Sequence, residues 1–215
     1  MLVGDHFLVA RSLKHSVLGV VLAGGKSSRF GADKATAVLG GETLLSRVCR
    51  RAAPQVATLL INRNVGGAAD HPLEYEVLPD EFSEQGPLAG VLAGLARAHS
   101  ENLPFLATFA CDTPFFPDHT VDRLWDGLRG SDAEYCVAQR AGIEHRAIAL
   151  WDVRCREPLN AAFSAGLRSL HGVSAALRKA AAEFAISGEG PGGDAFFNIN
   201  TPKDLACAAR WSASH

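Results

Sequence analysis

Residues 17–34 read VLGVVLAGGKSSRFGADK, and this stretch determines how the rest of the chain is interpreted. Residues 17–23 form an apolar run of strand length, which leads into a turn with three glycines and the basic residues Lys26, Arg29 and Lys34. Glycine tolerates positive φ and lets successive N–H groups approach an anion, and basic side chains add charge. The stretch predicts a strand followed by a phosphate-binding loop; a tight turn with solvated basic residues is the alternative.

Two common phosphate-binding loops do not fit this stretch. A Walker A loop requires a glycine five residues before Gly25, and that position is Val20, with the glycine one residue earlier at Gly19. A dinucleotide-binding fingerprint is also absent, because Gly24 and Gly25 are adjacent and Ser28 occupies the place of a further glycine. The sequence therefore predicts a phosphate loop of another kind.

Composition indicates an ordinary globular α/β protein. The 215 residues are 47% hydrophobic and 20% charged, and this length suits one sizeable domain. We expect a flexible N-terminal extension over residues 1–16 and a single domain over residues 17–215. A formal net charge of −2 gives no electrostatic reason to expect nucleic acid or an anionic membrane as partner.

Targeting and redox signals indicate a cytoplasmic protein. The longest apolar runs, around residues 16–25 and 102–111, are about half the length that a membrane span requires. Residues 1–16 lack the ordered regions of a secretory signal. The cysteines are odd in number and contain no C-x-x-C pair: Cys49, Cys111, Cys136, Cys155 and Cys207. This pattern favours a reducing compartment.

Strand and helix patterns alternate through the first two thirds of the chain, which predicts a three-layer, Rossmann-like fold with a mostly parallel sheet. Strands are expected at residues 17–23, 56–61, 75–78, 105–110, 135–139, 146–151 and 196–197. Helices are expected at residues 43–53, from Pro87, near 118–128, at 155–168 and 172–182, and from Thr201. The late pair of strands around Ala141 and Gly142 predicts a hairpin, and with it one antiparallel element.

Polar residues follow several of these strands. Asn62 and Arg63 come after one strand, Asp80 after the next, and Asp112 after the strand at residues 105–110. The carboxyl ends of strands in open α/β sheets are where ligands bind, although Asn62 also suits a solvated turn. Asp112 fits either a magnesium ligand beside a phosphate loop or a residue that closes a turn before Pro114.

The chain resembles the MobA-like nucleotidyltransferases, and among them the molybdenum cofactor guanylyltransferases. The resemblance begins with the signature LAGG-x-S-x-R-x-G-x-D-K, matched by Leu22, Ala23, Gly24, Gly25, Ser27, Arg29, Gly31, Asp33 and Lys34, with Phe30 where methionine is usual. Four further matches follow in the family's order: Asn62-Arg63; Asp80 with Gly86-Pro87-Leu88-Ala89-Gly90; Cys111-Asp112-Thr113-Pro114; and Asn198-Ile199-Asn200-Thr201-Pro202 with Asp204-Leu205.

The resemblance implies a binding site for GTP and Mg²⁺. It places GTP on Leu22, Ala23, Gly24 and Gly25, with Asn62 and Asp80 near the guanosine. Gly25 points to guanine, since related enzymes with other nucleotides resemble LAAG rather than LAGG. A carboxylate at Asp80 could accept hydrogen bonds from guanine N1–H and the exocyclic amine. The sequence leaves open whether Asp80 faces the base or the ribose. Arg29 and Lys34 would hold phosphate, and Asp112 the metal.

The reaction implied is attack by the terminal phosphate of molybdopterin on the α-phosphorus of GTP, which gives the guanine dinucleotide of the cofactor and pyrophosphate. A phosphate nucleophile is already anionic near neutral pH, so no strong general base and no nucleophilic side chain are needed. Cys111 is accordingly interpreted as a buried small residue.

The acceptor side departs from the resemblance at one position. Members often carry a His-Pro or Gln-Pro step there, whereas this chain has His145 and Arg146. Arg146 could bind an acceptor phosphate or mark another acceptor, and His145 is interpreted as a surface residue in a turn. Asn198 and Asn200 are further acceptor-side candidates, because alternate residues of an extended segment point the same way and could share a ligand.

Two other functions remain open at this point. One is a cytidylyl- or sugar-phosphate nucleotidylyltransferase of the same fold, and the other is a non-catalytic nucleotide-binding protein. The presence of Lys34 and Asp112 argues against the second. Cofactor-biosynthesis proteins or proteins of molybdoenzyme maturation are expected as partners through the resemblance alone.

Overall fold

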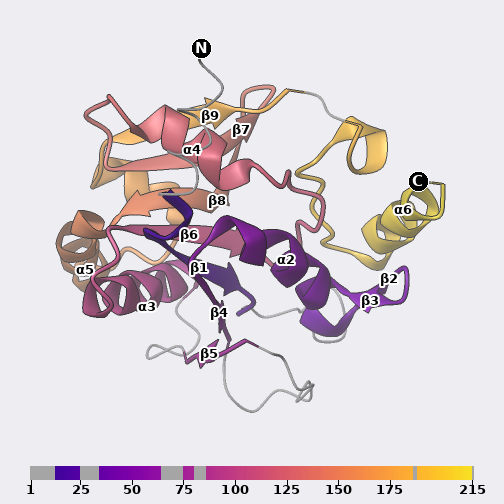
Figure 1. The fold of residues 1–215 in the computed structure, drawn as a ribbon, viewed down its shortest axis with the longest axis horizontal. Helices are drawn as coiled ribbons and strands as arrows, with labels where there is room; N and C mark the ends of the chain where they lie inside the picture. The colour runs from indigo at the N-terminus through magenta and orange to yellow at the C-terminus, as the bar shows by residue number, and fades with distance from the viewer. Residues whose placement is uncertain (1–12, 25–33, 64–74, 80–85, 186–187, 215) are drawn as a thin grey trace.

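A computed structural model of the protein describes residues 13–24, 34–63, 75–79, 86–185 and 188–214. Its centre is a seven-stranded sheet in the order β5-β4-β1-β6-β8-β7-β9 (Figure 1). The strands are β1 (Val17–Leu22), β4 (Thr58–Asn62), β5 (Val77–Leu78), β6 (Phe105–Ala110), β7 (Tyr135–Arg140), β8 (Ile143–Asp152) and β9 (Lys179–Glu183).

The sheet is mostly parallel. Strands β1, β4, β5 and β6 pair in parallel, as do β7 and β9, whereas β8 is antiparallel to both β6 and β7. The predicted α/β fold with one antiparallel element is confirmed, and so is the hairpin, whose turn contains Ala141 in the left-handed region with φ of 48°.

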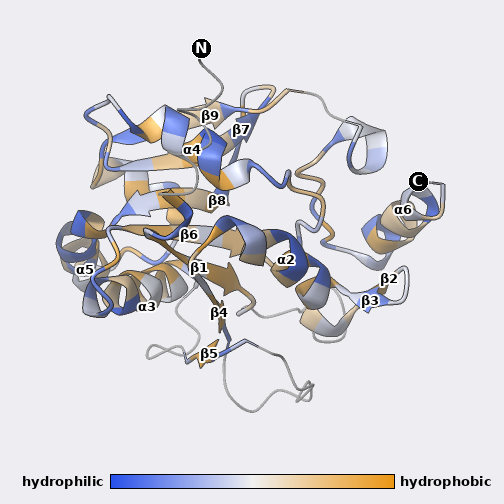
Figure 2. Ribbon diagram, in the orientation of Figure 1, coloured by the Kyte–Doolittle hydropathy of each residue, from blue (hydrophilic) through white to orange (hydrophobic). Residues whose placement is uncertain are grey.

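Helices cover both faces of the sheet. Leu18 and Val20 of β1 pack in one core cluster with α3 (Pro87–Ser100) and α5 (Arg156–Ser164). Val17 and Val21 face the other cluster, with α2 (Leu44–Ala52) and α4 (Thr120–Leu128). Alternate residues of a strand point to opposite faces, so a strand covered on both sides is apolar throughout. Figure 2 shows this hydrophobic centre.

A smaller third cluster lies where α6 (Pro202–Ser212) meets the hairpin of β2 (Val38–Leu39) and β3 (Glu42–Thr43). Its buried members are Leu39, Leu44, Phe115, Ile199 and Ala208. Residue 115 follows β6 and residue 199 precedes α6, so this cluster brings the C-terminal part of the chain against the carboxyl edge of the sheet.

Short 3-10 turns connect several elements. They are η1 (Lys34–Thr36), η2 (Ala53–Gln55), η3 (Val153–Cys155), η4 (Leu170–Ala175) and η5 (Pro191–Gly193). The structure describes residues 13–16 of the predicted extension. The Leu13 side chain is buried in one of the core clusters, with 6% of its surface exposed.

Helix α3 approaches the sheet closely through its glycines. A Cβ atom at Gly94 would lie 2.9 Å from Leu106 Cδ1, and one at Gly90 would lie 2.2 Å from Asn62 Oδ1. These positions have no room for a side chain. Helix and sheet therefore pack closely here, and at Gly90 this packing reaches the end of β4.

Helix ends follow their local sequence signals. The Thr43 hydroxyl accepts a hydrogen bond from Ser46 N at 3.1 Å at the start of α2, and Pro87 is the first residue of α3. Thr201 and Asp204 form a capping box at the start of α6. Each device occupies backbone N–H groups that the first turn of a helix leaves without intrahelical partners, or removes one.

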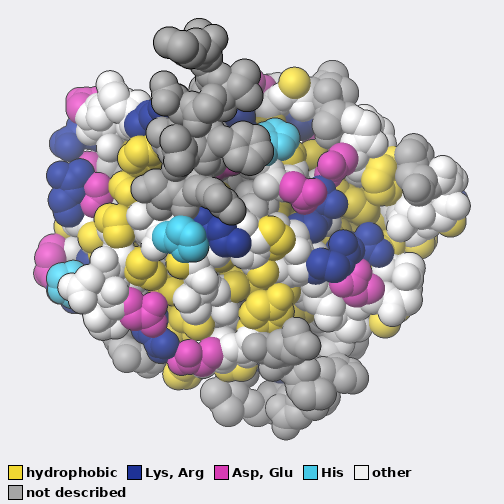
Figure 3. Space-filling model, in the orientation of Figure 1, with side chains coloured by type: hydrophobic (Ala, Val, Ile, Leu, Met, Phe, Trp, Pro, Cys, Tyr) yellow, Lys and Arg dark blue, Asp and Glu magenta, His cyan; other side chains and the backbone are white. Residues whose placement is uncertain are grey.

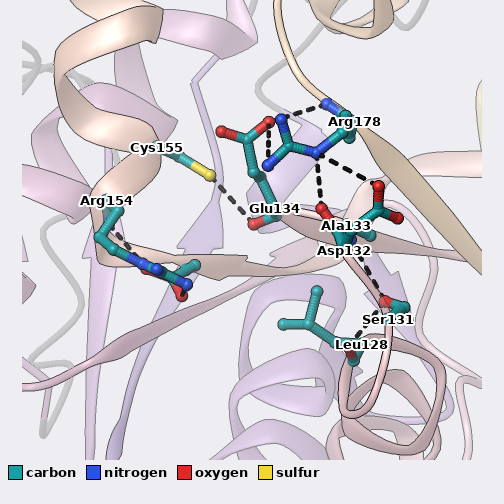
Figure 4. A network of polar contacts seen from close by, with 9 residues as sticks. Leu128, Ser131, Asp132, Ala133, Glu134, Arg154, Cys155 and Arg178 are labelled. Carbon is teal, nitrogen blue, oxygen red and sulfur yellow. Dashed lines mark hydrogen bonds and ion pairs between the residues drawn. The ribbon is translucent and has the colours of Figure 1, made fainter.

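The prediction of a helix at residues 172–182 is wrong. This segment contains the end of η4 and strand β9, which pairs in parallel with β7. Figure 4 shows the contacts just before the start of β9. Arg178 N donates to a carboxylate oxygen of Glu134 at 3.0 Å, and Arg178 Nε donates to Asp132 O at 2.6 Å. Alanine-rich composition favours a helix locally, but pairing of this segment with the edge of β7 outweighs that preference.

Other predicted boundaries also differ. Residues 196–197 form no strand; Phe196 is buried, and its N–H donates to Asp194 Oδ1 at 3.0 Å rather than to a ladder partner. The helix predicted at 155–168 ends at Ser164, and the strands predicted from residues 56 and 75 begin at Thr58 and Val77.

The surface carries charges of both signs. The face in Figure 3 shows basic and acidic side chains beside one another among hydrophobic ones. No helix within the described ranges is long and apolar enough to cross a bilayer. All five cysteines are free thiols, and Cys111 is buried, as interpreted from the sequence.

Candidate nucleotide-transfer site

Three parallel strands end side by side at the edge where the sequence places its polar residues. Leu22 at the end of β1 is in register with Asn62 of β4 and with Ala110 of β6. Beyond the strands, Ala23 N donates to Asn62 O at 2.9 Å, and Cys111 N donates to Leu22 O at 3.3 Å. The register therefore brings residues 22–24, 62 and 112 to one edge, where open α/β sheets bind ligands.

Lys34 lies at the centre of this edge. Its ammonium group donates to Asp112 Oδ2 at 2.8 Å and to Asn200 Oδ1 at 2.8 Å, which joins positions 78 and 166 residues away along the chain. The side chains of Lys34 and Asp112 are 18% and 24% exposed. A half-buried ion pair of this kind places one positive and one negative group where a charged ligand can reach both.

Asn62 is buried at the end of β4, on the same edge of the sheet. Its side-chain amide is 3% exposed and donates to Leu78 O at 3.3 Å, which links the end of β4 to β5. Its Oδ1 atom lies against the backbone of Gly90 in α3. The neighbouring Arg63 is also buried, so the sequence interpretation of this cluster as a solvated turn does not describe residues 62 and 63.

The segment at residues 198–200 closes the site from the C-terminal part of the chain. Ile199 is fully buried, its N–H donates to Asp112 O at 2.8 Å, and the asparagines on either side of it are exposed. Asn198 and Asn200 therefore flank a buried residue, in a segment outside the sheet. The Asn200 side chain accepts a hydrogen bond from the Lys34 ammonium.

The amino end of β8 borders the same edge, because β8 runs antiparallel to β6. Arg146 lies there and forms an ion pair with Glu144 at 2.9 Å, and Glu144 also binds the Lys179 ammonium. Hydrogen bonding to Lys179, together with the charge of Arg146, lowers the pKa of Glu144. Arg146 thus lies near the carboxyl edge of the sheet, in an ion pair with Glu144.

The interpretation of His145 as a turn residue is wrong. It lies within β8, and its ring stacks on Phe196 with centroids 4.7 Å apart. Burial lowers the pKa of His145. The positive charge of Arg140 lowers this pKa further, and the negative charge of Asp194 opposes the shift. The imidazole is accordingly neutral at pH 7, and its contact is with an aromatic ring rather than with solvent.

Several predicted site residues lie outside the described residues: Gly25, Arg29 and Asp80. Sequence analysis, in turn, missed a role for Asp204, whose Oδ2 accepts a hydrogen bond from Asn200 N at 3.1 Å. The signal was present as Thr201-Pro202 followed by an acidic residue three positions after the threonine, which is typical of a capping box.

The donor set fits Mg²⁺. Asp112 Oδ1 is 3.3 Å from the Thr113 hydroxyl, a long hydrogen bond that leaves acceptor capacity on the carboxylate. No group of three or more His, Cys, Asp or Glu side chains suited to a metal occurs in the described part of the chain. Mg²⁺ commonly binds one or two carboxylates and takes its other ligands from phosphate and water, so a single aspartate suits it.

A mostly parallel sheet of this order, with Lys34, Asp112 and Asn200 in contact at its carboxyl edge, is consistent with a nucleotidyltransferase. Residues 19–184 match the family described as MobA-like NTP transferase domain, and the chain belongs to that family. The predicted class of enzyme is thereby confirmed.

Relatives agree over most of the chain. A molybdenum cofactor guanylyltransferase of Cereibacter sphaeroides is 41% identical over 193 residues, which cover 89% of this chain and 95% of the relative. A second protein of the same name from Rhizobium meliloti is 39% identical over 197 residues, 89% of this chain and 90% of the relative.

Solved structures share the fold. The molybdopterin-guanine dinucleotide biosynthesis protein A of Archaeoglobus fulgidus superposes with a TM-score of 0.72 at 21% identity, covering 92% of this chain and all of that one. A CMP:2-keto-3-deoxy-manno-octonic acid synthetase complexed with CTP gives 0.68 at 13% identity, over 93% and 99% of the two chains.

Proposed function

We propose that this enzyme transfers GMP from GTP to the terminal phosphate of molybdopterin, giving molybdopterin guanine dinucleotide and pyrophosphate. The observation that carries the proposal is the position of Lys34, which contacts Asp112 on the nucleotide side and Asn200 on the C-terminal segment. Relatives up to 41% identical that bear the name molybdenum cofactor guanylyltransferase support the base and the acceptor.

The chemistry asks the protein for positioning and charge neutralisation. Lys34 and Arg29 would bind phosphate oxygens, and the backbone of Gly24 and Gly25 would supply N–H donors to the departing pyrophosphate. The acceptor phosphate is itself the nucleophile, so no side chain has to be deprotonated. Buried Cys111 therefore takes no part in bond formation.

Asp112 would hold Mg²⁺. When bound, the metal neutralises charge on the triphosphate, as it does in other phosphoryl-transfer enzymes. In the protein described here, the Asp112 carboxylate is balanced by Lys34, so metal binding has to share or replace that ion pair. We expect EDTA to abolish turnover and added Mg²⁺ to restore it; turnover that persists in EDTA would exclude the metal role.

Selection of guanine is assigned to Asp80, with Asn62 at the guanosine. The test is calorimetric binding of GTP, CTP and ATP with Mg²⁺, measured for the wild type and for Asp80→Ala. A preference for GTP that the variant loses supports guanylyl transfer with Asp80 at the base. A preference for CTP, or none, would contradict the guanine assignment and favour another nucleotidylyltransferase of this fold.

The acceptor would lie toward β8 and residues 198–200. Arg146 and Asn198 are the side chains proposed to contact it, since Arg146 stands at the carboxyl edge and Asn198 is exposed beside the site. We place the enzyme in the cytoplasm, where free thiols such as its five persist, and expect it to meet other proteins of cofactor biosynthesis or molybdoenzyme maturation.

A further inference from the structure

Asp204, in the first turn of α6, makes contacts beside the site that the chemistry above does not use. Its Oδ2 atom accepts three hydrogen bonds: from Asn200 N at 3.1 Å, from Thr201 N at 2.8 Å and from the Thr201 hydroxyl at 2.8 Å. Two of these belong to the cap of α6. The third reaches back to the residue whose side chain binds Lys34.

The contacts form a closed ring. Asp112 binds Lys34 through its carboxylate, Lys34 binds the Asn200 side chain, and the backbone one residue earlier, at Ile199, returns to the Asp112 carbonyl at 2.8 Å. The side chain of Ile199 is fully buried in the cluster that α6 shares with the β2–β3 hairpin. The backbone of Asn200 is therefore fixed on one side by Ile199 and on the other by Asp204.

We propose that Asp204 is a positioning residue for nucleotide transfer: it fixes the backbone of Asn200, and the Asn200 amide oxygen in turn holds the Lys34 ammonium in the orientation that receives phosphate. This inference rests on the proposed role of Lys34. It assigns to the first turn of α6 a function in the site, beyond ending the helix, and it makes the orientation of Lys34 depend on residues from both ends of the chain.

Removal of the carboxylate tests the inference. We expect Asp204→Ala to fold and to bind the Mg²⁺–nucleotide complex about tenfold more weakly, because Lys34 loses a well-placed hydrogen-bond partner while keeping Asp112. We expect Asp204→Asn to retain most of the affinity, since its amide oxygen can still accept the hydrogen bond from Asn200 N. If Asp204→Asn keeps the affinity that Asp204→Ala loses, the hydrogen-bond geometry of residue 204 matters rather than its charge. Equal losses of affinity in both variants would overturn the proposal.

A double-mutant cycle gives the decisive measurement. If Asp204 acts through Asn200, the variant Asn200→Ala and the double variant Asp204→Ala/Asn200→Ala should lose the same affinity, within about twofold. Losses that multiply would show that Asp204 acts by another route and would overturn the assignment. Binding is measured by calorimetry with whichever of GTP and CTP the wild type prefers, so the outcome does not depend on the base.

Two caps serve as controls for mere destabilisation. Thr43→Ala removes the cap of α2 and Thr201→Ala weakens the cap of α6, and neither removes the contact between Asp204 and Asn200. We expect both to lower the melting temperature and to keep wild-type affinity. An affinity loss in Thr201→Ala as large as in Asp204→Ala would mean that the cap alone matters, and would overturn the proposal.

Discussion

The two sides of the site stand on different frameworks. The nucleotide side stands on β1, β4 and β6, parallel strands covered by helices on both faces, whose register fixes where residues 22, 62 and 112 lie. The acceptor side stands on antiparallel β8 and on an extended segment outside the sheet at residues 198–200. The groups proposed to bind the triphosphate are thus positioned mainly by sheet geometry, and those proposed to face the acceptor are positioned by individual side-chain contacts.

This difference predicts unequal responses to mutation. On the nucleotide side a single substitution should remove chemistry and leave the frame intact. On the acceptor side it should change affinity for one substrate only. The contact between Lys34 and Asn200 is where the two frameworks meet.

The largest effect is expected at Asp112. Asp112→Ala should lower turnover by about 100- to 1,000-fold, as the loss of a group that stabilises transition-state charge does, with little change in melting temperature, since the side chain is partly exposed. The adjacent variant Cys111→Ala should keep most activity. An Asp112→Ala enzyme with normal turnover would remove the metal assignment.

Arg146 tests the acceptor side. Arg146→Ala should raise the KM for molybdopterin about tenfold through loss of one charge-assisted contact, and should leave the KM for GTP unchanged. The matched control is Arg154→Ala, which removes an exposed arginine from an ion pair with Asp152 at the far end of β8. A parallel change in both KM values would contradict the separation of the two frameworks.

Two glycines of α3 allow packing in the core to be compared with packing against a site residue. Gly90→Ala and Gly94→Ala should each destabilise the protein by about 1–3 kcal/mol, because a new Cβ meets Asn62 Oδ1 in the first and Leu106 in the second. Only Gly90→Ala should also weaken GTP binding, since it displaces Asn62. Chemical denaturation and calorimetry measure the two effects; equal GTP affinities would show that the position of Asn62 is unimportant.

The smallest effect near neutral pH concerns the buried thiols. Burial raises the pKa of Cys49, in α2, from 9.0 to about 12, and that of Cys136, in β7, from 9.0 to about 11. A raised folded-state pKa gives stability that is complete below pH 9 and lost as the pH rises toward 11 and 12.

The melting temperature should therefore be insensitive to these thiols from pH 7 to 8 and should fall above pH 9. The variants Cys49→Ala and Cys136→Ala should each reduce that fall. A loss of stability above pH 9 that is identical in wild type and both variants would assign it to other groups.

The positions of the polar residues at the ends of β4 and β6 could be predicted from the sequence for a physical reason. Strands buried on both faces must be apolar throughout, and a polar residue directly after such a strand can only lie at its carboxyl edge, as Asp112 does. The position of Lys34 came from its motif. Its partner Asn200, 166 residues away, could be expected only from the family resemblance, since no local pattern connects them.

The C-terminal part of the chain was predicted less well because its signals are weak or non-local. The segment KAAAE of β9 has helical composition and becomes a strand through pairing with β7. Phe196 looked like a strand residue because it is apolar, and it is buried against His145 and Phe184 instead. Neither outcome can be derived from a window of neighbouring residues.

The ring through Lys34 has a consequence for biosynthesis of the protein. Lys34 leaves the ribosome 166 residues before Asn200, a delay of roughly 10–30 s at usual rates of translation. Strands β1, β4 and β6 can pair during this interval, whereas the lysine waits for a partner that emerges only with α6. The residues of the phosphate loop are thus synthesised long before the site can be completed. We therefore expect a nascent chain to become able to catalyse transfer only late in its synthesis.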